Sequence, residues 1–134
     1  MSVRLVVVAA LAAPPASGAS VIVGVAGLGT ATGDIRIALY ADAAGFDARE
    51  SAFARTVPAL VPGVSVVFED VPPGDYAALV YHDIDADGEL RRGTFGIPVE
   101  PWTGSTAGSR FRAPSWNAYA FVVAEEAIEL DLSF

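Results

Sequence analysis

Short apolar runs separated by glycine, proline and aspartate fill this chain from residue 20 onward, and this spacing constrains the fold more than any other feature. Within residues 34–41 apolar and polar residues alternate, with Ile35, Ile37 and Leu39 at the odd positions. A period of two places one face of a strand against a core and the other toward solvent. Several such strands with turn residues between them are typical of an all-β fold. We therefore expect an antiparallel β-sandwich of about seven strands with essentially no helix.

The other predicted strands follow from the same pattern. They cover residues 21–26, 64–69, 76–81, 117–124 and 128–134, with a short strand or bridge at 93–98. The run at 76–81 is almost continuously apolar, which favours a central strand that is covered on both faces. Before it, Pro72, Pro73 and Gly74 predict a tight turn, because glycine permits the backbone angles that close such a turn.

Residues 42–62 form the least regular part of the predicted domain. Pro58 and Pro62 exclude a long helix, because proline removes a backbone donor and clashes with the preceding turn. One or two helical turns are expected from Phe46, with Asp47 as the N-cap. We predict that this segment is a crossover loop that carries the chain from one sheet to the other.

The first part of the chain has the three-part pattern of a secretory leader. Arg4 supplies a positive charge, residues 5–13 an apolar run, and Ser17 to Ala19 the small residues of a cleavage site. The apolar run is too short to span a bilayer. We expect cleavage after Ala19, which leaves residues 20–134 as one domain in the periplasm or outside the cell, without membrane insertion. A retained amphiphilic anchor is the alternative.

Charge and cysteine content narrow the function classes. The formal net charge of the whole chain is −8, which repels phosphate backbones and anionic lipid surfaces and attracts cations. Nucleic acid is therefore not an expected partner. The chain has no cysteine, so it holds neither disulfides nor a cysteine-ligated metal. Its length suffices for one self-standing core rather than two.

The acidic stretch that begins at Asp83 is the strongest candidate for a metal site. Asp83, Asp85 and Asp87 alternate with other residues before Gly88, as in the first half of a calcium-binding loop. Carboxylates at alternate positions of such a loop converge on one hard cation, and the glycine permits the sharp bend. The next residue, Glu89, would contribute its backbone carbonyl.

The second half of this loop departs from the calcium motif. Its ninth position is Arg91, and its twelfth is Thr94, which cannot replace the bidentate glutamate of the motif. Glu100 is the nearest downstream carboxylate. Two interpretations remain open: a turn whose aspartates accept bonds from their own backbone amides, or a calcium site. The predicted ligands are Asp83, Asp85, Asp87, Glu89 and Glu100.

His82 is the only histidine, and it directly precedes the aspartates. The chain has no nucleophile-elbow pattern and no local partner set for a catalytic triad. We expect a hydrogen-bonded structural residue that fixes the loop rather than a catalytic base. The rival hypothesis is a hydrolase acting on an extracellular glycan or peptide, with His82 and neighbouring carboxylates such as Asp83, Asp85 and Glu100 as acid and base.

Aromatic and basic residues bracket a long polar loop predicted at 100–115. Exposed aromatic residues are enriched at recognition surfaces, although burial is the more frequent fate of tryptophan. The alternative to burial is a rim that binds a protein or a carbohydrate. The candidate residues of this ligand surface are His82, Trp102, Arg110 and Trp116.

Five segments of the chain, taken in order, resemble the bacterial family known as domain of unknown function 2141. They are GDIRIALY at 33–40, VVFEDVPPGDY at 66–76, HDIDADG at 82–88, FGIPVE at 95–100 and APSWNA at 113–118. The resemblance extends over residues 21–134. The string from His82 and Asp83 through Gly88 to the Gly-Ile-Pro-x-Glu segment is its most specific part.

This resemblance implies both a fold and a setting. The family consists of small exported proteins of unknown function. The PPGDY turn is also similar to that of transthyretin-like, carboxypeptidase-regulatory and Cna-B-type sandwiches, which implies a transthyretin-like or immunoglobulin-like sandwich here. The chain departs from the family at Arg91, where an acidic residue is usual, and at residues 101–103, where Gly-Tyr-Gly is frequent. We expect an exported, non-enzymatic binding or envelope accessory module.

Overall fold

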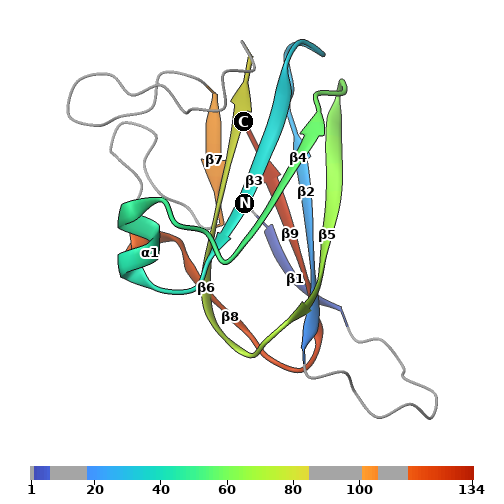
Figure 1. The fold of residues 1–134 in the computed structure, drawn as a ribbon. Helices are drawn as coiled ribbons and strands as arrows, with labels where there is room; N and C mark the ends of the chain where they lie inside the picture. The colour runs from blue at the N-terminus through green and yellow to red at the C-terminus, as the bar shows by residue number, and fades with distance from the viewer. Residues whose placement is uncertain (1, 7–17, 85–100, 106–114) are drawn as a thin grey trace.

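The computed structural model describes residues 2–6, 18–84, 101–105 and 115–134, and it arranges them as two β-sheets packed face to face (Figure 1). One sheet has the strand order β1-β9-β2-β5, and the other has β4-β3-β6-β7 with β8 also paired to β6. The all-β sandwich expected from the sequence is confirmed. The strands are β1 Ser2–Val6, β2 Ala19–Ala26, β3 Asp34–Tyr40, β4 Phe53–Pro58, β5 Gly63–Val71, β6 Gly74–Asp83, β7 Trp102–Gly104, β8 Ala120–Val123 and β9 Ala127–Ser133; the helices are α1 Ala43–Ala48 and α2 Trp116–Tyr119.

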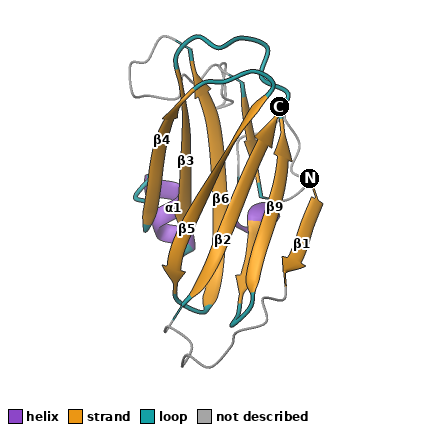
Figure 2. Ribbon diagram, turned by 90° about the vertical axis from the view of Figure 1, so that its right-hand side faces the viewer, coloured by secondary structure: helices purple, strands orange, loops and turns teal. Residues whose placement is uncertain are grey.

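Most neighbouring strands are antiparallel, as expected, but β2 and β9 run parallel to each other. The chain changes sheet four times: between β2 and β3, between β4 and β5, between β5 and β6, and between β8 and β9. Figure 2 shows the consequence: β5, β2, β9 and β1 lie side by side in one layer, with β4, β3 and β6 behind them. The predicted crossover between sheets therefore occupies only the short connection at residues 59–62.

Alternation with a period of two accounts for the core between the sheets. Ile35, Ile37 and Leu39 of β3 are buried, as the sequence predicted. The same alternation buries every second residue of β2 and β9. β6 differs, because consecutive residues Tyr76 to Val80 are all buried. It is the central strand that its continuous apolar run predicted.

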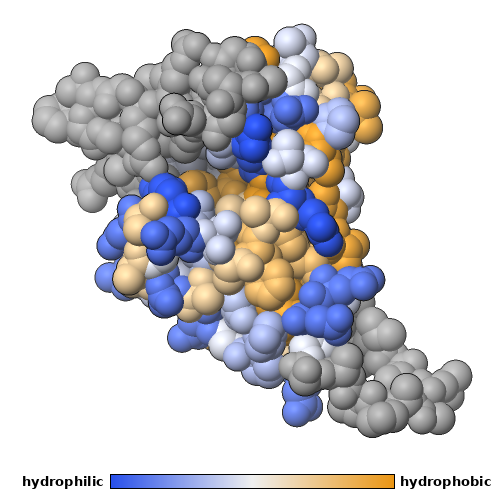
Figure 3. Space-filling model, viewed as in Figure 1, coloured by the Kyte–Doolittle hydropathy of each residue, from blue (hydrophilic) through white to orange (hydrophobic). Residues whose placement is uncertain are grey.

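A second apolar cluster covers the outer face of the sheet that contains β6. It is lined by the two helices, which lie against this face (Figure 1). Ser105 links β6 to α2, since its Oγ accepts from the Ala78 N–H at 2.9 Å and donates to the Tyr119 carbonyl. Figure 3 shows hydrophilic and weakly apolar residues on the solvent side of α1, so the helix shields this cluster. Its buried members are Tyr40, Phe46, Ala77, Leu79, Trp102 and Tyr119.

The helical segment begins earlier than the sequence predicted. Its N-cap is Asp42 and not Asp47, because the Asp42 carboxylate accepts a bond from the Gly45 N–H at 2.6 Å. It ends at Arg49, which adopts a left-handed conformation with φ of 58°. The predicted crossover also contains β4, which pairs along its whole length with β3.

Three other segments differ from the predicted elements. The predicted strand at 117–124 begins as the helical turn α2 and becomes strand only from Ala120. The predicted loop at 100–115 contains the short strand β7, opposite β6. Residues 2–6, which lie in the predicted leader, form β1 at the edge of the sheet beside β9. The strand or bridge predicted at 93–98 lies outside the described residues.

Tyr76 gives the folded domain a predicted sensitivity to alkaline pH. The residue is buried, its hydroxyl donates to the Pro72 carbonyl at 2.8 Å, and burial raises the pKa of Tyr76. A pKa that is higher in the folded state contributes stability that is complete below the unfolded value of about 10 and is lost as pH rises through the folded value. Tyr76→Phe is therefore expected to cost about 1 kcal/mol at neutral pH and to flatten the fall in stability above about pH 10. Urea unfolding at several pH values measures both, and a parallel decline in the two proteins would contradict the prediction.

Candidate functional site

The end of the sandwich where β6 terminates holds the residues that the sequence marked most strongly. His82 and Asp83 are the last two residues of β6, and they lie opposite Ile35 and Asp34 of β3. Both side chains are buried. The segment that follows them contains the remaining aspartates and lies outside the described residues. The structure therefore describes the residues from which that segment starts.

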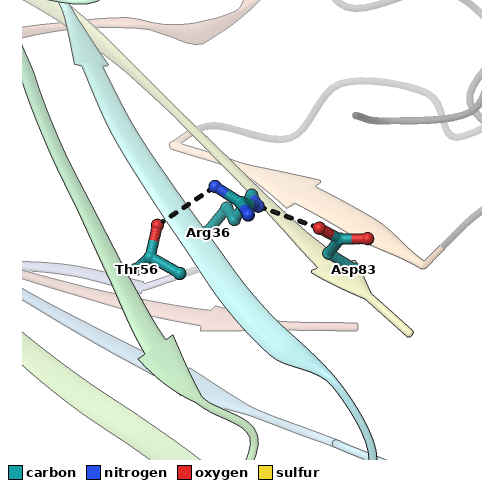
Figure 4. A network of polar contacts seen from close by, with 3 residues as sticks. All are labelled: Arg36, Thr56 and Asp83. Atoms are coloured by element: carbon teal, nitrogen blue, oxygen red, sulfur yellow. Dashed lines mark hydrogen bonds and ion pairs between the residues drawn. The ribbon is translucent and has the colours of Figure 1, made fainter. Parts of the chain in front are cut away.

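Asp83 is engaged by an arginine from the neighbouring strand. Its carboxylate lies 2.9 Å from the Arg36 Nε, with the Asp83 side chain 0% exposed and the Arg36 side chain 31% exposed. The Arg36 Nη1 also donates to the Thr56 hydroxyl at 3.3 Å. Figure 4 shows the resulting chain of contacts, which crosses from β6 over β3 to β4. These bonds tie three adjacent strands together at the end of β6.

The electrostatics of this contact favour the charged pair. The hydrogen bond to Asp83 raises the pKa of Arg36, and desolvation opposes this effect only in part. A buried carboxylate without a cation nearby would pay a large desolvation penalty. Arg36 therefore compensates a charge that the sandwich keeps entirely away from water. Asp83 is a structural anchor in this arrangement.

His82 has backbone partners on both its main chain and its side chain. Its Nε2 lies 2.6 Å from the Thr32 carbonyl oxygen, which can only accept, so we assign the ring proton to Nε2. Its own N–H donates to the Pro101 carbonyl at 2.8 Å, and its ring stacks against Phe134. These contacts agree with the structural, hydrogen-bonded role expected for His82.

Gly33 makes the close approach of β3 and β6 possible. It has φ of 79°, and a Cβ at this position would lie 2.2 Å from the Asp83 carbonyl oxygen. Only glycine combines this backbone conformation with this proximity. Nothing in the sequence pattern marked the close contact of Gly33 with Asp83.

The structure describes one of the five predicted calcium ligands. Asp83 is described and is engaged by Arg36, whereas Asp85, Asp87, Glu89 and Glu100 lie outside the described residues. Across residues 2–6, 18–84, 101–105 and 115–134, no three histidine, cysteine or acidic side chains lie close enough together to hold a metal ion.

The residues predicted to form a ligand surface do not share one environment. The structure buries Trp102 in the second cluster, edge to face with Tyr119 at 6.1 Å between ring centroids. Trp116 is half-buried against Phe46 in the same cluster. His82 is buried at the end of β6, and Arg110 lies outside the described residues. Trp102 and His82 thus serve packing and hydrogen bonding rather than an exposed rim.

These features define a two-sheet β-sandwich in which buried polar contacts brace the end that carries the acidic connection. Residues 23–131 match the family model described as "uncharacterized protein conserved in bacteria (DUF2141)", and since this match spans most of the chain, the chain belongs to that family. The resemblance seen in the sequence is confirmed at this level. No curated protein and no solved structure shows a significant match to the chain.

Proposed function

We propose that this protein is an exported, non-enzymatic binding module whose acidic loop after β6 holds calcium. The observation that supports this most is the bracing of that loop at its origin. Asp83 is fixed by Arg36, and His82 by Thr32, directly before the loop begins. Binding residues work best when rigid elements and buried hydrogen bonds support them. The sandwich supplies such a support.

The proposed location rests on the leader pattern in the sequence. Arg4, the apolar run at 5–13 and the small residues before Ser20 have the order of a leader that is removed after Ala19. In the structure Ala19 is the first residue of β2 and is buried, so this cleavage would remove only the first residue of that strand. None of the helices in the described ranges is long and apolar enough to cross a membrane. We infer a periplasmic or secreted domain.

The net charge of −8 and the acidic composition of the loop support a cationic ligand. Three aspartates close together repel one another unless a cation or hydrogen bonds compensate them. Asp83 already has Arg36, so the cation would be held by Asp85, Asp87, the Glu89 carbonyl and Glu100. A hard divalent ion with oxygen ligands, such as calcium, fits this donor set. The larger partner would be a protein or a carbohydrate.

The hydrolase hypothesis requires a histidine that a substrate can reach, and the described contacts of His82 argue against one. A histidine that acts as general acid or base must reach the substrate with a ring nitrogen. The Nε2 of His82 is bonded to Thr32, and its ring is buried against Phe134. We therefore propose a binding function in preference to hydrolysis.

Calcium is expected to stabilise the purified protein. At about ten times Kd, a ligand that binds only the folded state adds about 1.4 kcal/mol, which raises Tm by about 5 °C for a domain of this size. The double variant Asp85→Asn/Asp87→Asn should lose this rise, since it removes two of the proposed ligands. Differential scanning fluorimetry with calcium and then with chelator measures the effect.

The matched control is Glu125→Gln/Glu126→Gln. It removes the same two charges from the exposed connection between β8 and β9, near the start of β6 and therefore at the opposite end of the sandwich. This variant should keep the full calcium response. An unchanged Tm in the wild type, or an equal loss of response in both variants, would refute the calcium proposal.

A further inference from the structure

The outer edge of β9 is the edge that β1 covers. In the structure this edge pairs antiparallel with β1, from Ser2 opposite Asp131 to Val6 opposite Ala127. Figure 2 shows β1 as the outermost strand of its sheet, beside β9. The inner edge of β9 pairs with β2. If β1 leaves, the backbone groups of β9 on its outer side lose their partners, and an unpaired edge is a template for another strand.

The burial pattern of β9 indicates which kind of segment can pair with its outer edge. Ile128, Leu130 and Leu132 are buried toward the core, whereas Glu129 and Asp131 alternate with them and are half-buried on the other face. A strand that pairs here needs apolar residues opposite the first set and polar residues opposite the acids. Residues of opposite charge directly across a strand pair stabilise it. A basic residue opposite Glu129 is therefore favoured.

β1 has this pattern. Its register places Val3 opposite Leu130 and Arg4 opposite Glu129. The chain thus provides its own example of an apolar and basic strand at this edge. Val3, the β1 residue whose exposure is described, is 43% exposed, so this side chain is not sealed into the core.

A second copy of β9 fits this edge less well. Antiparallel pairing of two β9 strands centred on Leu130 would place Glu129 opposite Asp131 of the other copy. A register centred on either acid would place identical acids opposite each other. Like charges directly across a strand pair destabilise it. The acidic positions therefore select a partner that brings positive charge.

We propose that the outer edge of β9 is a strand-acceptor site for an extended segment of another protein, in which apolar residues alternate with polar ones and a basic residue lies opposite Glu129. β1 holds this place in the full chain and vacates it when the leader is removed. The second statement rests on the proposed export, whereas the first rests on the register of β1 and β9 alone. Main-chain bonds at such an edge give affinity, and the alternate side chains give specificity.

The test uses the full chain with a weakened β1. Val3→Pro/Leu5→Pro removes backbone donors and fixes φ in that strand, which disfavours its pairing. The labelled peptide Ser-Val-Arg-Leu-Val is titrated into the variant and into the wild type, with chemical shifts of the protein amides as the readout. A tethered strand competes at an effective concentration of about millimolar, so the variant is expected to bind the peptide at least about tenfold more tightly. The shifts should concentrate in residues 127–133.

A charge exchange tests the proposed register. With β1 weakened, Glu129→Arg should reduce peptide affinity about threefold or more, and the peptide carrying Arg4→Glu should restore it. Glu69→Arg is the matched control, because it makes the same change on an exposed position of β5, at the other edge of this sheet. This control should leave the affinity unchanged. If the proline variant fails to fold, Arg4→Glu weakens β1 by placing two acids opposite each other and keeps the test available.

The proposal is overturned if the peptide does not bind once β1 is weakened, if the shifts fall on β5 or on the sheet faces, or if Glu129→Arg and Glu69→Arg act alike. Export is tested separately, by mass measurement of the N-terminus after expression in a secreting host. A retained Met1 would refute the export proposal while leaving the acceptor result intact. Processing after Ala19 without peptide binding would refute the acceptor site alone.

Discussion

Arg36→Leu is expected to lower Tm by about 10 °C, because it removes the cation beside a carboxylate that is 0% exposed. Removing one partner of a buried pair costs about 3–5 kcal/mol, and we take about 3 kcal/mol because Arg36 is itself 31% exposed. For a domain of this size 1 kcal/mol corresponds to about 3–4 °C. Thermal and urea unfolding of the purified variant measure this loss.

Because Asp83 is more deeply buried than Arg36, the two single variants should differ in their cost to stability. Asp83→Asn should cost only about 1–2 kcal/mol, because it keeps an acceptor and leaves a cation that reaches water. The double variant Arg36→Leu/Asp83→Leu should recover most of the loss, as apolar replacement of buried pairs often does. Arg55→Leu is the control for the loss of one positive charge, since Arg55 is exposed on β4. Equal costs for the two single variants, or additive costs in the double variant, would contradict the argument.

The strands that the sequence predicted correctly are those with one face in the core. β9 alternates throughout and β3 alternates as far as Leu39, so Ile37 and Leu130 could be assigned to the interior from the pattern alone. β6 was recognised for the opposite reason, because a strand between the sandwich core and a second cluster has no polar face. In each case the burial of side chains leaves a pattern in the local sequence, and that pattern predicted the strand.

The elements that the sequence missed are those in which burial leaves no pattern. β4 has mostly exposed side chains, and its pairing with β3 is made by backbone groups that any residue carries. The N-cap was misplaced because Gly45 lies inside α1, where a helix-disfavouring residue argues against a helical turn. α2 is a single turn held by the second cluster, and only tertiary packing selects it over a strand.

The sequence marked a candidate segment for the site, but it did not predict the contacts where that segment begins. The alternating aspartates marked the segment after β6, and His82 was correctly interpreted as a hydrogen-bonded residue. The role of Asp83 depends on Arg36, which is 47 positions away along the chain and becomes a neighbour only through the pairing of β3 with β6. The close contact of Gly33 with Asp83 also arises where β3 pairs with β6. Non-local strand pairing therefore determines which cation lies beside Asp83.

Phe46→Ala is expected to cost about 4 kcal/mol, the typical cost of deleting a fully buried phenylalanine side chain. Phe46 is 0% exposed and lies at the centre of the second cluster. Its ring meets Tyr40 edge to face at 5.2 Å, and Trp116 and Tyr119 at 6.3 Å, measured between centroids. The Arg49 guanidinium covers it at 4.7 Å. No other α1 side chain is buried in the described structure, so the docking of the helix depends on this ring.

The position of the cluster determines how the loss appears. Phe46 touches the outer face of the sheet and not the core between the sheets, so the deletion should release α1 and α2 before the sandwich unfolds. Tryptophan fluorescence, which reports Trp102 and Trp116, should therefore change at lower urea than circular dichroism. Phe46→Leu, which keeps most of the volume, should cost less than about 1.5 kcal/mol, and Leu60→Ala, at an exposed position, should cost little. Coincident transitions with the full cost would instead show that the two clusters unfold as one unit, and a cost no larger than that of Phe46→Leu would refute the central role of this ring.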